Sequence, residues 1–166
     1  ARAAVLERGY RVKDKSFGQI APLAGFAASE EPELQIEARP SQEWTAGVAA
    51  LQSGIKTHAG NLAAIIEKVR LPAAFATWLV EGEAVAFGMS VAERGMAEIG
   101  LICVHPDHRG HGYGRRIVQG LMGWAAAMDC HNAYLQVEQS NAVAINLYGS
   151  FGFRQLYQYE TRILDL

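Results

Sequence analysis

The stretch CVHPDHRGHGYGRRIVQGL, at residues 103–121, constrains the fold of this chain more than any other feature. It follows an apolar run typical of a strand, and Gly110, Gly112 and Gly114 stand where that run ends. After them, apolar residues at helical spacing predict an amphipathic helix: Ile117, Leu121, Trp124, Ala125 and Met128. Glycine costs roughly 0.5–1 kcal/mol against alanine inside regular structure. The glycines therefore indicate a turn that needs bare backbone.

This turn has the features of an anion-binding site. A glycine-rich turn that opens a helix points several backbone N–H groups toward one place, next to the positive end of the helix dipole. Arg109, Arg115 and Arg116 add positive charge. A P-loop would need Gly-Lys-Ser/Thr after the turn, and a dinucleotide fold would need G-x-G-x-x-G in a parallel βαβ unit. Neither pattern is present, so the turn predicts phosphate binding of another kind.

The rest of the chain predicts a mixed α/β fold with a mostly antiparallel sheet flanked by helices. The short turns EGE and ERG separate β-rich runs at 73–80, 83–93 and 96–104, which is typical of an antiparallel meander. Ser41 predicts the N-cap of a helix that ends near Leu51. We also expect a strand at 34–40, a helix at about 58–70, a strand at 133–138 and a helix at 141–152. Residues 153–164 predict a final strand, or two strands separated by a kink.

Composition limits the partners and the location that we expect. The formal net charge of −2 gives no general attraction to nucleic acid or to an anionic membrane. The longest apolar runs are shorter than the ~20 residues that span a bilayer. Cys103 and Cys130 are the two cysteines, and with no signal peptide before them they favour free thiols in a reducing cytoplasm. We therefore expect a cytoplasmic protein with no nucleic-acid or membrane partner.

A short internal repeat bears on the domain organisation. Gly9-Tyr10-Arg11 aligns with Gly152-Phe153-Arg154, and each triplet stands between a helix end and a strand. If the repeat is genuine, residues 1–24 are the tail of a preceding copy, 25–33 a linker and 34–166 a whole second copy. A chance similarity is the alternative.

Two motifs in the second half of the chain identify a family. The run Arg109-Gly110-His111-Gly112-Tyr113-Gly114 resembles the R/Q-x-x-G-x-G/A signature of the GNAT superfamily of N-acetyltransferases. The run SNAVAINLYGSFGF, at 140–153, is similar to that family's N-x-x-x-x-x-x-Y-x-x-x-G-F segment. The order of the elements between 34 and 164 fits as well. The resemblance implies the GNAT acyl-CoA N-acyltransferase fold, acetyl-CoA as co-substrate, a small-molecule or peptide amine as acceptor, and the possibility of a homodimer.

The resemblance also implies roles for individual residues. Tyr148 matches the family's general acid, which protonates the leaving thiolate, and Glu98 matches the base of the histone-acetyltransferase branch. Strand alternation places Glu98 on the face of Gly100 and Ile102. The pantetheine arm would contact strand main chain, and the pyrophosphate would contact the glycine turn. The implied cofactor-binding residues are Ile102, Cys103, Val104, Arg109, Gly110, His111, Gly112, Tyr113, Gly114, Arg115 and Asn141.

Plainer interpretations stay open for several of these residues. Tyr148 can be a packed aromatic, Asn141 a helix cap, and Glu98 a solvated carboxylate at a strand end. Gln136 stands where the branch that acetylates protein N-termini has a carboxylate, so a chain of waters could replace the base. Cys103 fits a strand core better than an acyl carrier.

The histidines of the turn do not predict a metal site. His105, His108 and His111 are spaced three apart, but Pro106 and the glycines exclude a continuous helix, and no fourth ligand is near. We therefore expect no metal. The acceptor pocket is predicted from four aromatic residues: Trp44, His58, Tyr157 and Tyr159.

Three functions agree with the sequence. The first is an acetyl-CoA-dependent N-acetyltransferase that acts on a primary amine. The second is a non-catalytic acyl-CoA-binding module that regulates or scaffolds. The third is a general nucleotide-phosphate binder, for which ATP would compete as well as CoA.

Overall fold

The computed structural model describes residues 9–52 and 59–164. Within these residues the chain forms seven strands, four α-helices and a short 3-10 helix. It divides into a larger unit, Pro22–Ala133, and a smaller unit that joins Ala1–Ala21 to Tyr134–Leu166. This is the mixed α/β fold, with mostly antiparallel strands, that the sequence predicts.

The larger unit is built on an antiparallel meander. Its strands are β2 (Leu34–Glu37), β3 (Ala73–Val80), β4 (Glu83–Glu93) and β5 (Met96–Val104), in the order β2-β3-β4-β5. The turns between β3, β4 and β5 each hold two left-handed residues, Glu81-Gly82 and Arg94-Gly95. That backbone matches the twist of a tight hairpin. The three long strands therefore agree with the predicted ranges.

Two helices pack on one face of this meander, α2 (Gln42–Leu51) and α3 (Ala59–Ile66). The Ser41 hydroxyl caps α2 by accepting the Trp44 N–H at 2.9 Å, as predicted. The Trp44 indole N–H donates to the carbonyls of Ala76 and Gly88, at 3.1 and 3.2 Å. Around it lies the core of this face: Val48, Leu62, Ile66, Ala73, Phe75, Phe87 and Met89. Helix α3 ends at Ile66, earlier than the expected residue 70.

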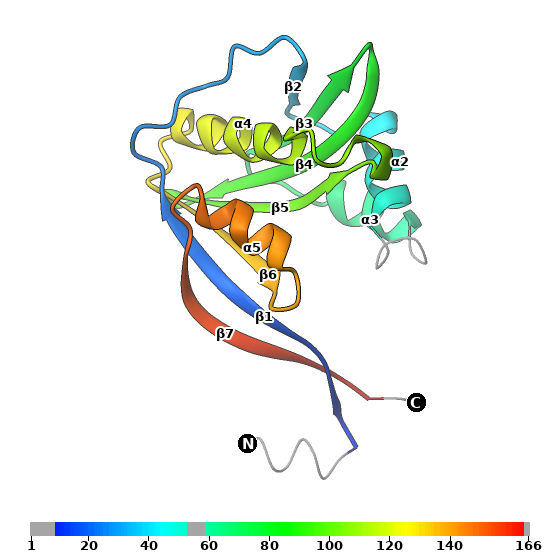
Figure 1. Ribbon diagram of the computed structural model, residues 1–166, viewed down its shortest axis with the longest axis vertical. Coiled ribbons are helices and arrows are strands. Elements are labelled where there is room, and N and C mark those ends of the chain that lie inside the picture. The colour runs from blue at the N-terminus through cyan, green and yellow to red at the C-terminus, as the bar shows by residue number, and fades with distance from the viewer. Residues whose placement is uncertain (1–8, 53–58, 165–166) are drawn as a thin grey trace. The chain divides into compact units, whose positions relative to one another are not determined.

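The helix α4 (Tyr113–Ala127) covers the opposite face (Figure 1). Gly88 of β4 lies under it, in a space where a Cβ atom would collide with Ile102, Ile117 and Leu121. The buried side chains of α4 include Val118, Met122 and Ala125. The meander is thus sandwiched between α2 and α3 on one side and α4 on the other.

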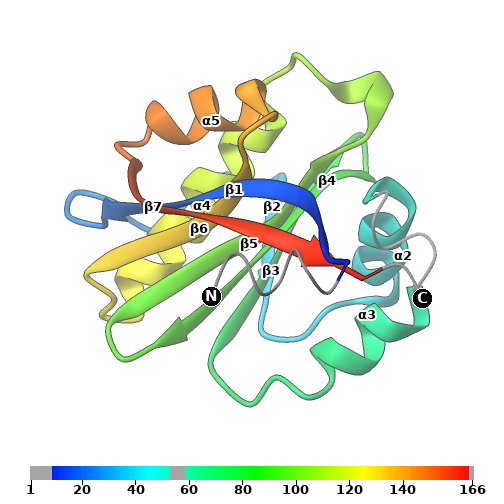
Figure 2. The ribbon, with the colours of Figure 1, turned by 90° about the horizontal axis from the view of Figure 1, so that it is seen from below.

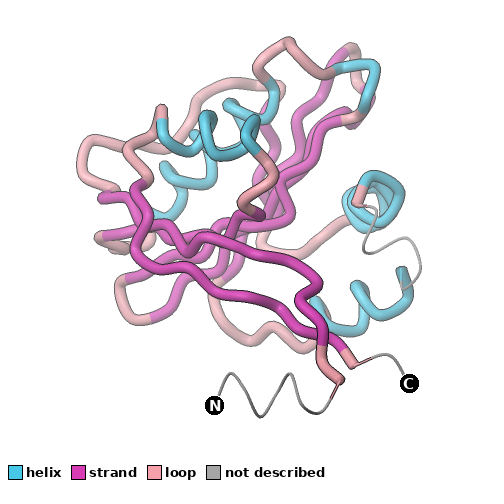
Figure 3. The backbone as a smooth tube through the Cα atoms, turned by 60° about the horizontal axis from the view of Figure 1, so that its bottom comes forward, coloured by secondary structure: helices cyan, strands magenta, loops and turns pink. Residues whose placement is uncertain are grey.

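The smaller unit contains β6 (Asn132–Glu138), α5 (Ala142–Gly149), β7 (Arg154–Ile163) and β1 (Arg11–Pro22). Its strand order is β6-β1-β7, and β1 pairs antiparallel with β7. The two strands run side by side in blue and red in Figure 2, and as two long magenta strands in Figure 3. The sequence predicts each of these elements but not the place of β1 between β6 and β7.

No helix in the described part of the chain is long and apolar enough to cross a bilayer.

Candidate active site

The glycine turn opens α4 in the way that the sequence predicts. Gly110 and Gly112 have φ values of 81° and 83°, and Gly112 is the N-cap of α4, with no side-chain cap. A Cβ atom at either position would meet nothing within 4 Å. The turn thus leaves open space beside the N-terminus of a 15-residue helix, where the helix dipole favours an anion.

The three arginines of the turn are not equivalent. The Arg109 guanidinium donates through Nε to the Val104 carbonyl at 3.3 Å, which ties the turn to the end of β5. Arg116 forms an ion pair with Glu31 and lies 5.9 Å from the ring centre of Trp78. Because the Glu31 carboxylate neutralises part of the positive charge of Arg116, this arginine would attract an anion less strongly than the sequence alone indicates.

Aromatic rings fix the first residue of α4. The Tyr113 ring stacks on Trp78, with ring centres 5.8 Å apart, and on His111, with centres 5.7 Å apart. His111 in turn donates from Nδ1 to the Arg109 carbonyl at 3.0 Å. The turn is therefore held by contacts among its own side chains and with β3, so its backbone is preorganised before any ligand binds.

A β-bulge interrupts β5 just before the turn. The register passes from Met89↔Gly100 to Phe87↔Cys103, so two residues of β5, Leu101 and Ile102, lie opposite one residue of β4. Leu101 has a φ of 55°, a conformation that is strained for a residue other than glycine. A bulge leaves backbone N–H and C=O groups out of the ladder, where a ligand can use them.

The bulge corrects one prediction about Glu98. Glu98 is paired with Val91, which packs with the core under α2 and α3, and it lies 3.3 Å from the position that a Gly100 Cβ would take. Ile102 instead faces α4. Glu98 therefore shares a face with Gly100, as predicted, but not with Ile102, because the extra residue reverses the alternation of the strand.

Burial changes the chemistry of two side chains on this strand. Burial raises the pKa of the Glu98 carboxyl above its ordinary value of 4.5. Glu98 is partly exposed, so its carboxylate is less solvated than that of a fully exposed residue at a strand end. Cys103 packs against the core under α2 and α3. Burial raises the pKa of its thiol to about 12, although the positive charge of Arg109 acts the other way.

Two of the predicted residues, Asn141 and Tyr148, belong to the smaller unit. Asn141 is the N-cap of α5, and its side-chain oxygen accepts the Ala144 N–H at 3.1 Å. Capping is therefore one role of this residue. Tyr148 is 8% exposed, and its ring meets Phe153 edge to face at 5.9 Å. Burial raises the pKa of Tyr148 to about 12, so the phenol keeps its proton at neutral pH.

The structure groups the other predicted site residues in the larger unit. Glu98 and the cofactor-binding residues of β5 and the turn follow one another from the bulge to the start of α4: Ile102, Cys103, Val104, Arg109, Gly110, His111, Gly112, Tyr113, Gly114 and Arg115.

The predicted acceptor pocket needs correction. Trp44 is 1% exposed and holds the core together, so it lines no pocket. His58 lies outside the described residues. Tyr157 and Tyr159 lie on β7 in the smaller unit, where the Tyr159 hydroxyl donates to Gln136.

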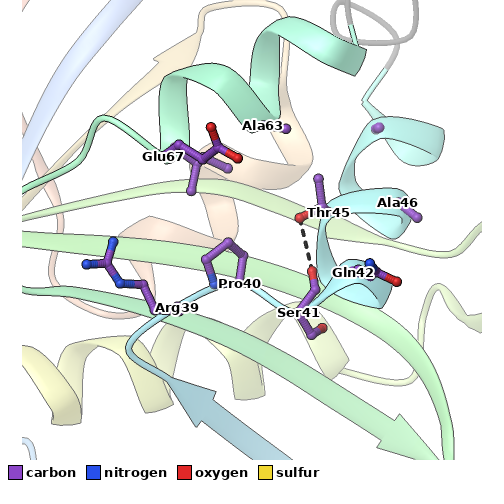
Figure 4. Close-up of a pocket in the computed structure, with 10 residues that line it drawn as sticks. Arg39, Pro40, Ser41, Gln42, Thr45, Ala46, Ala63 and Glu67 are labelled. Atoms are coloured by element: carbon purple, nitrogen blue, oxygen red, sulfur yellow. Dashed lines mark hydrogen bonds between the residues drawn. The ribbon is translucent and has the colours of Figure 1, made fainter.

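A pocket that the sequence did not reveal lies between α2 and α3 (Figure 4), with a volume of about 540 Å³. Arg39 and Glu67 place opposite charges on walls that are otherwise uncharged, in part polar and in part apolar. No spacing in the sequence joins these two segments, so only the packed helices reveal the pocket. Its lining comprises Arg39, Pro40, Ser41, Gln42, Thr45, Ala46, Ala49, Ala63, Ile66 and Glu67.

Among the described residues, no group of three or more His, Cys, Asp or Glu side chains is arranged to hold a metal ion. His105 and His108 contact each other edge to face, with ring centres 5.8 Å apart, and His105 also accepts the Asp107 N–H.

The larger unit thus combines a helix-flanked antiparallel meander, a bulge in its last strand and a glycine turn at the N-terminus of α4. Residues 37–153 match the model of the Acetyltransferase (GNAT) family. Because the match covers more than half of the chain, this chain belongs to the GNAT family.

Curated and solved proteins are similar to this chain in sequence or in fold. The uncharacterized N-acetyltransferase YobR of Bacillus subtilis is 33% identical over 69 residues, which are 42% of this chain and 28% of that protein. A GNAT-family acetyltransferase structure from Novosphingobium aromaticivorans has a TM-score of 0.66 at 24% identity, over 90% of this chain and 64% of that one. A structure of a GCN5-related N-acetyltransferase from Sphaerobacter thermophilus has a TM-score of 0.75 at 16% identity, over 97% of this chain and 54% of that one.

A tandem GNAT protein from the clavulanic acid biosynthesis pathway has the same fold, with a TM-score of 0.70 at 14% identity. The match includes 97% of this chain and 56% of that protein. This chain therefore spans less than two thirds of the length of each of these relatives.

Proposed function

We propose that this domain transfers the acetyl group of acetyl-CoA directly to the nitrogen of a primary amine. Family membership supports acetyl transfer in general. The observation that carries the proposal is the turn at Gly110–Gly112, where two left-handed glycines leave open space beside the N-terminus of α4. That space fits the diphosphate of coenzyme A, which must approach backbone N–H groups closely.

The proposed binding residues supply backbone hydrogen-bonding groups and positive charge for the cofactor. Backbone amides from Gly110 to Arg115 would hold the diphosphate, and Arg109 would add charge next to it. Main-chain groups of Ile102, which lies in the bulge, and of Cys103 and Val104 would bind the pantetheine arm. Asn141 would offer its side-chain N–H₂ while its oxygen caps α5.

The reaction requires two proton transfers, and we assign each to a side chain. Glu98 would take a proton from the amine, because its raised pKa makes it a stronger base than an ordinary carboxylate. The amine arrives neutral and gives up this proton as its nitrogen bonds to the thioester carbon, so the nitrogen keeps the single proton of the amide when the C–S bond breaks. Tyr148 would give its proton to the sulfur, since its phenol stays protonated until far above neutral pH. No covalent enzyme intermediate is needed, which agrees with the buried, weakly acidic thiol of Cys103.

We place the reaction in the cytoplasm, with a free amine of a small molecule or peptide as acceptor. Both cysteines are free thiols, as a reducing compartment favours. The homodimer and the boundaries 1–24, 25–33 and 34–166 stay predictions.

The test is a panel of primary amines with acetyl-CoA, followed by thiol release, together with calorimetry of CoA and of ATP. We expect CoA to bind, ATP to compete poorly, and at least one amine class to release thiol. CoA binding with no turnover across the panel would instead support the non-catalytic acyl-CoA-binding module. Equal competition by ATP would support a general nucleotide-phosphate binder.

A further inference from the structure

The long ribbon of β1 and β7 carries an internal repeat in its backbone as well as in its sequence. Gly9 and Gly152 are 143 positions apart, and each is followed by an aromatic residue and an arginine. Both are left-handed, with φ values of 81° and 86°. β1 begins at Arg11 and β7 at Arg154, so each glycine stands two residues before its strand. Sequence and conformation thus point to the same equivalence between the two strands.

The bulges of the ribbon also relate β1 to β7. Any regular antiparallel ladder looks the same after a half-turn that exchanges its strands, so regular pairing is no evidence that the two strands are equivalent. The positions of the bulges are such evidence. β1 skips Lys13, between the pairs of Val12 and Asp14, and β7 skips Leu156, opposite the step from Gly18 to Gln19. Lys13 and Leu156 are again 143 positions apart.

The ladder also ends where the repeat predicts. Arg11 pairs with Ile163 at one end, and Ile20 pairs with Arg154 at the other. With the same offset, Arg11 is equivalent to Arg154, and Ile20 to Ile163. The half-turn therefore maps each end onto the other, and its axis passes through the central pair, Ser16 and Tyr159.

We propose that β1 and β7 are equivalent strands that come from two copies of one fold. The local two-fold axis relates one strand to the other. The second copy is a GNAT-like domain that precedes this one in the same polypeptide and ends in β1. The outer edge of β7, which no other described strand pairs with, is the surface on which that copy docks. This proposal does not depend on acetyl transfer.

The strand order specifies what the second copy contributes. β1 lies between β6 and β7, whereas β7 is the last strand of the order. The half-turn exchanges β1 and β7, so the outer edge of β7 is equivalent to the edge of β1 that β6 occupies. It therefore accepts the second copy's equivalent of β6 as a further strand.

The surface of β7 agrees with a docking edge. Its first five residues are exposed, and among them Leu156 is 65% and Tyr157 is 47% exposed. A long edge strand with exposed apolar side chains is a template for pairing with another chain, and natural proteins rarely leave one uncovered. A copy docked there would cover both side chains.

The experiment compares the intact polypeptide, purified from its natural source, with the 166-residue chain. Intact mass reports whether a further domain is joined to it, and hydrogen exchange reports the protection of residues 154–163. We expect the extra mass of at least about 100 residues. We also expect the amides of β7 to exchange at least about tenfold more slowly in the intact polypeptide, with those of β4 unchanged.

Two variants of the intact polypeptide separate docking from a general change in stability. Leu156→Lys places a charge on the proposed edge, so we expect the protection of β7 to fall. Val143→Lys, at an 82% exposed position on α5, is the matched control and should leave it unchanged. Equal exchange of β7 in both chains would overturn the proposal. So would protection without extra mass, which would indicate a second copy of this chain instead.

Discussion

The two glycines Gly112 and Gly82 allow the strain of a left-handed residue to be separated from the binding of a diphosphate. Their φ values are 83° and 86°, and a Cβ atom on either would meet nothing within 4 Å. Gly82 lies in the turn between β3 and β4, outside the glycine turn. Replacing either by alanine costs about 1–2 kcal/mol of unfolding free energy, because alanine is strained in this region. Both variants therefore lose similar stability.

Only Gly112→Ala should weaken the binding of coenzyme A. A methyl group at the N-cap of α4 occupies the open space through which a diphosphate would reach the backbone. Loss of one hydrogen bond from a backbone N–H to a charged oxygen costs about 1.5–3 kcal/mol, which is about a 10- to 150-fold loss of affinity. Gly112→Asp adds charge repulsion, and we expect it to abolish binding.

The assay is calorimetric titration with CoA, next to urea unfolding of the wild type, Gly112→Ala and Gly82→Ala. The unfolding curves establish that both variants carry comparable strain. Wild-type affinity in Gly112→Ala would refute the placement of the diphosphate at this turn. An equal loss of affinity in Gly82→Ala would show that strain alone lowers binding.

Three further predictions follow from the side chains of the site. Tyr148→Phe should lower kcat by about 100-fold or more with CoA affinity within about twofold, and unchanged turnover in steady-state kinetics would exclude the acid role. Because burial raises the pKa of Glu98, the folded state binds its proton more tightly than the unfolded state. The stability owed to this residue is therefore present at low pH and is lost as pH rises from 4.5 through the folded pKa. Glu98→Gln should thus gain melting temperature relative to wild type at pH 7 but not at pH 4, and parallel Tm profiles would contradict this. With a pKa of about 12, Cys103 should react with iodoacetamide at pH 8 at least about 100-fold more slowly in the folded chain than in urea, as peptide mass spectrometry can measure.

The hairpins and the turn could be predicted because their signals are local. Glu81-Gly82 and Arg94-Gly95 stand between alternating strands, and a two-residue loop with glycine second favours the left-handed pair that the structure contains. The cap at Ser41 and the glycines before α4 act within a few residues as well. Such features depend on conformational preference, which the sequence carries directly.

The bulge at Leu101 could not be predicted in the same way. Leucine disfavours a positive φ, so its type argues against the conformation that the strand adopts there. The register on both sides, from Met89↔Gly100 to Phe87↔Cys103, fixes the bulge through contacts that are distant in sequence. Simple strand alternation predicts Glu98 and Ile102 on one face of the sheet. The extra residue of the bulge places them on opposite faces.

Helix packing limited the prediction of the acceptor site. An aromatic residue on an amphipathic helix can face a ligand or the core, and its sequence neighbours do not distinguish the two. Trp44 faces the core, where the carbonyls of Ala76 and Gly88 accept its indole N–H. These carbonyls lie on β3 and β4, far along the chain, so the sequence offers no signal for them.

The repeat shows how a weak sequence signal becomes specific once a register is known. The triplets at Gly9 and Gly152 are too short to separate a true repeat from coincidence. Lys13 and Leu156 share no chemistry, so no comparison of residue types would align them. Yet each is the residue that its strand leaves unpaired, at the offset set by the glycines. The matching bulges indicate that β1 and β7 are equivalent strands. Because β6 lies beside β1 in the strand order, this equivalence is what predicts a β6-like strand at the outer edge of β7.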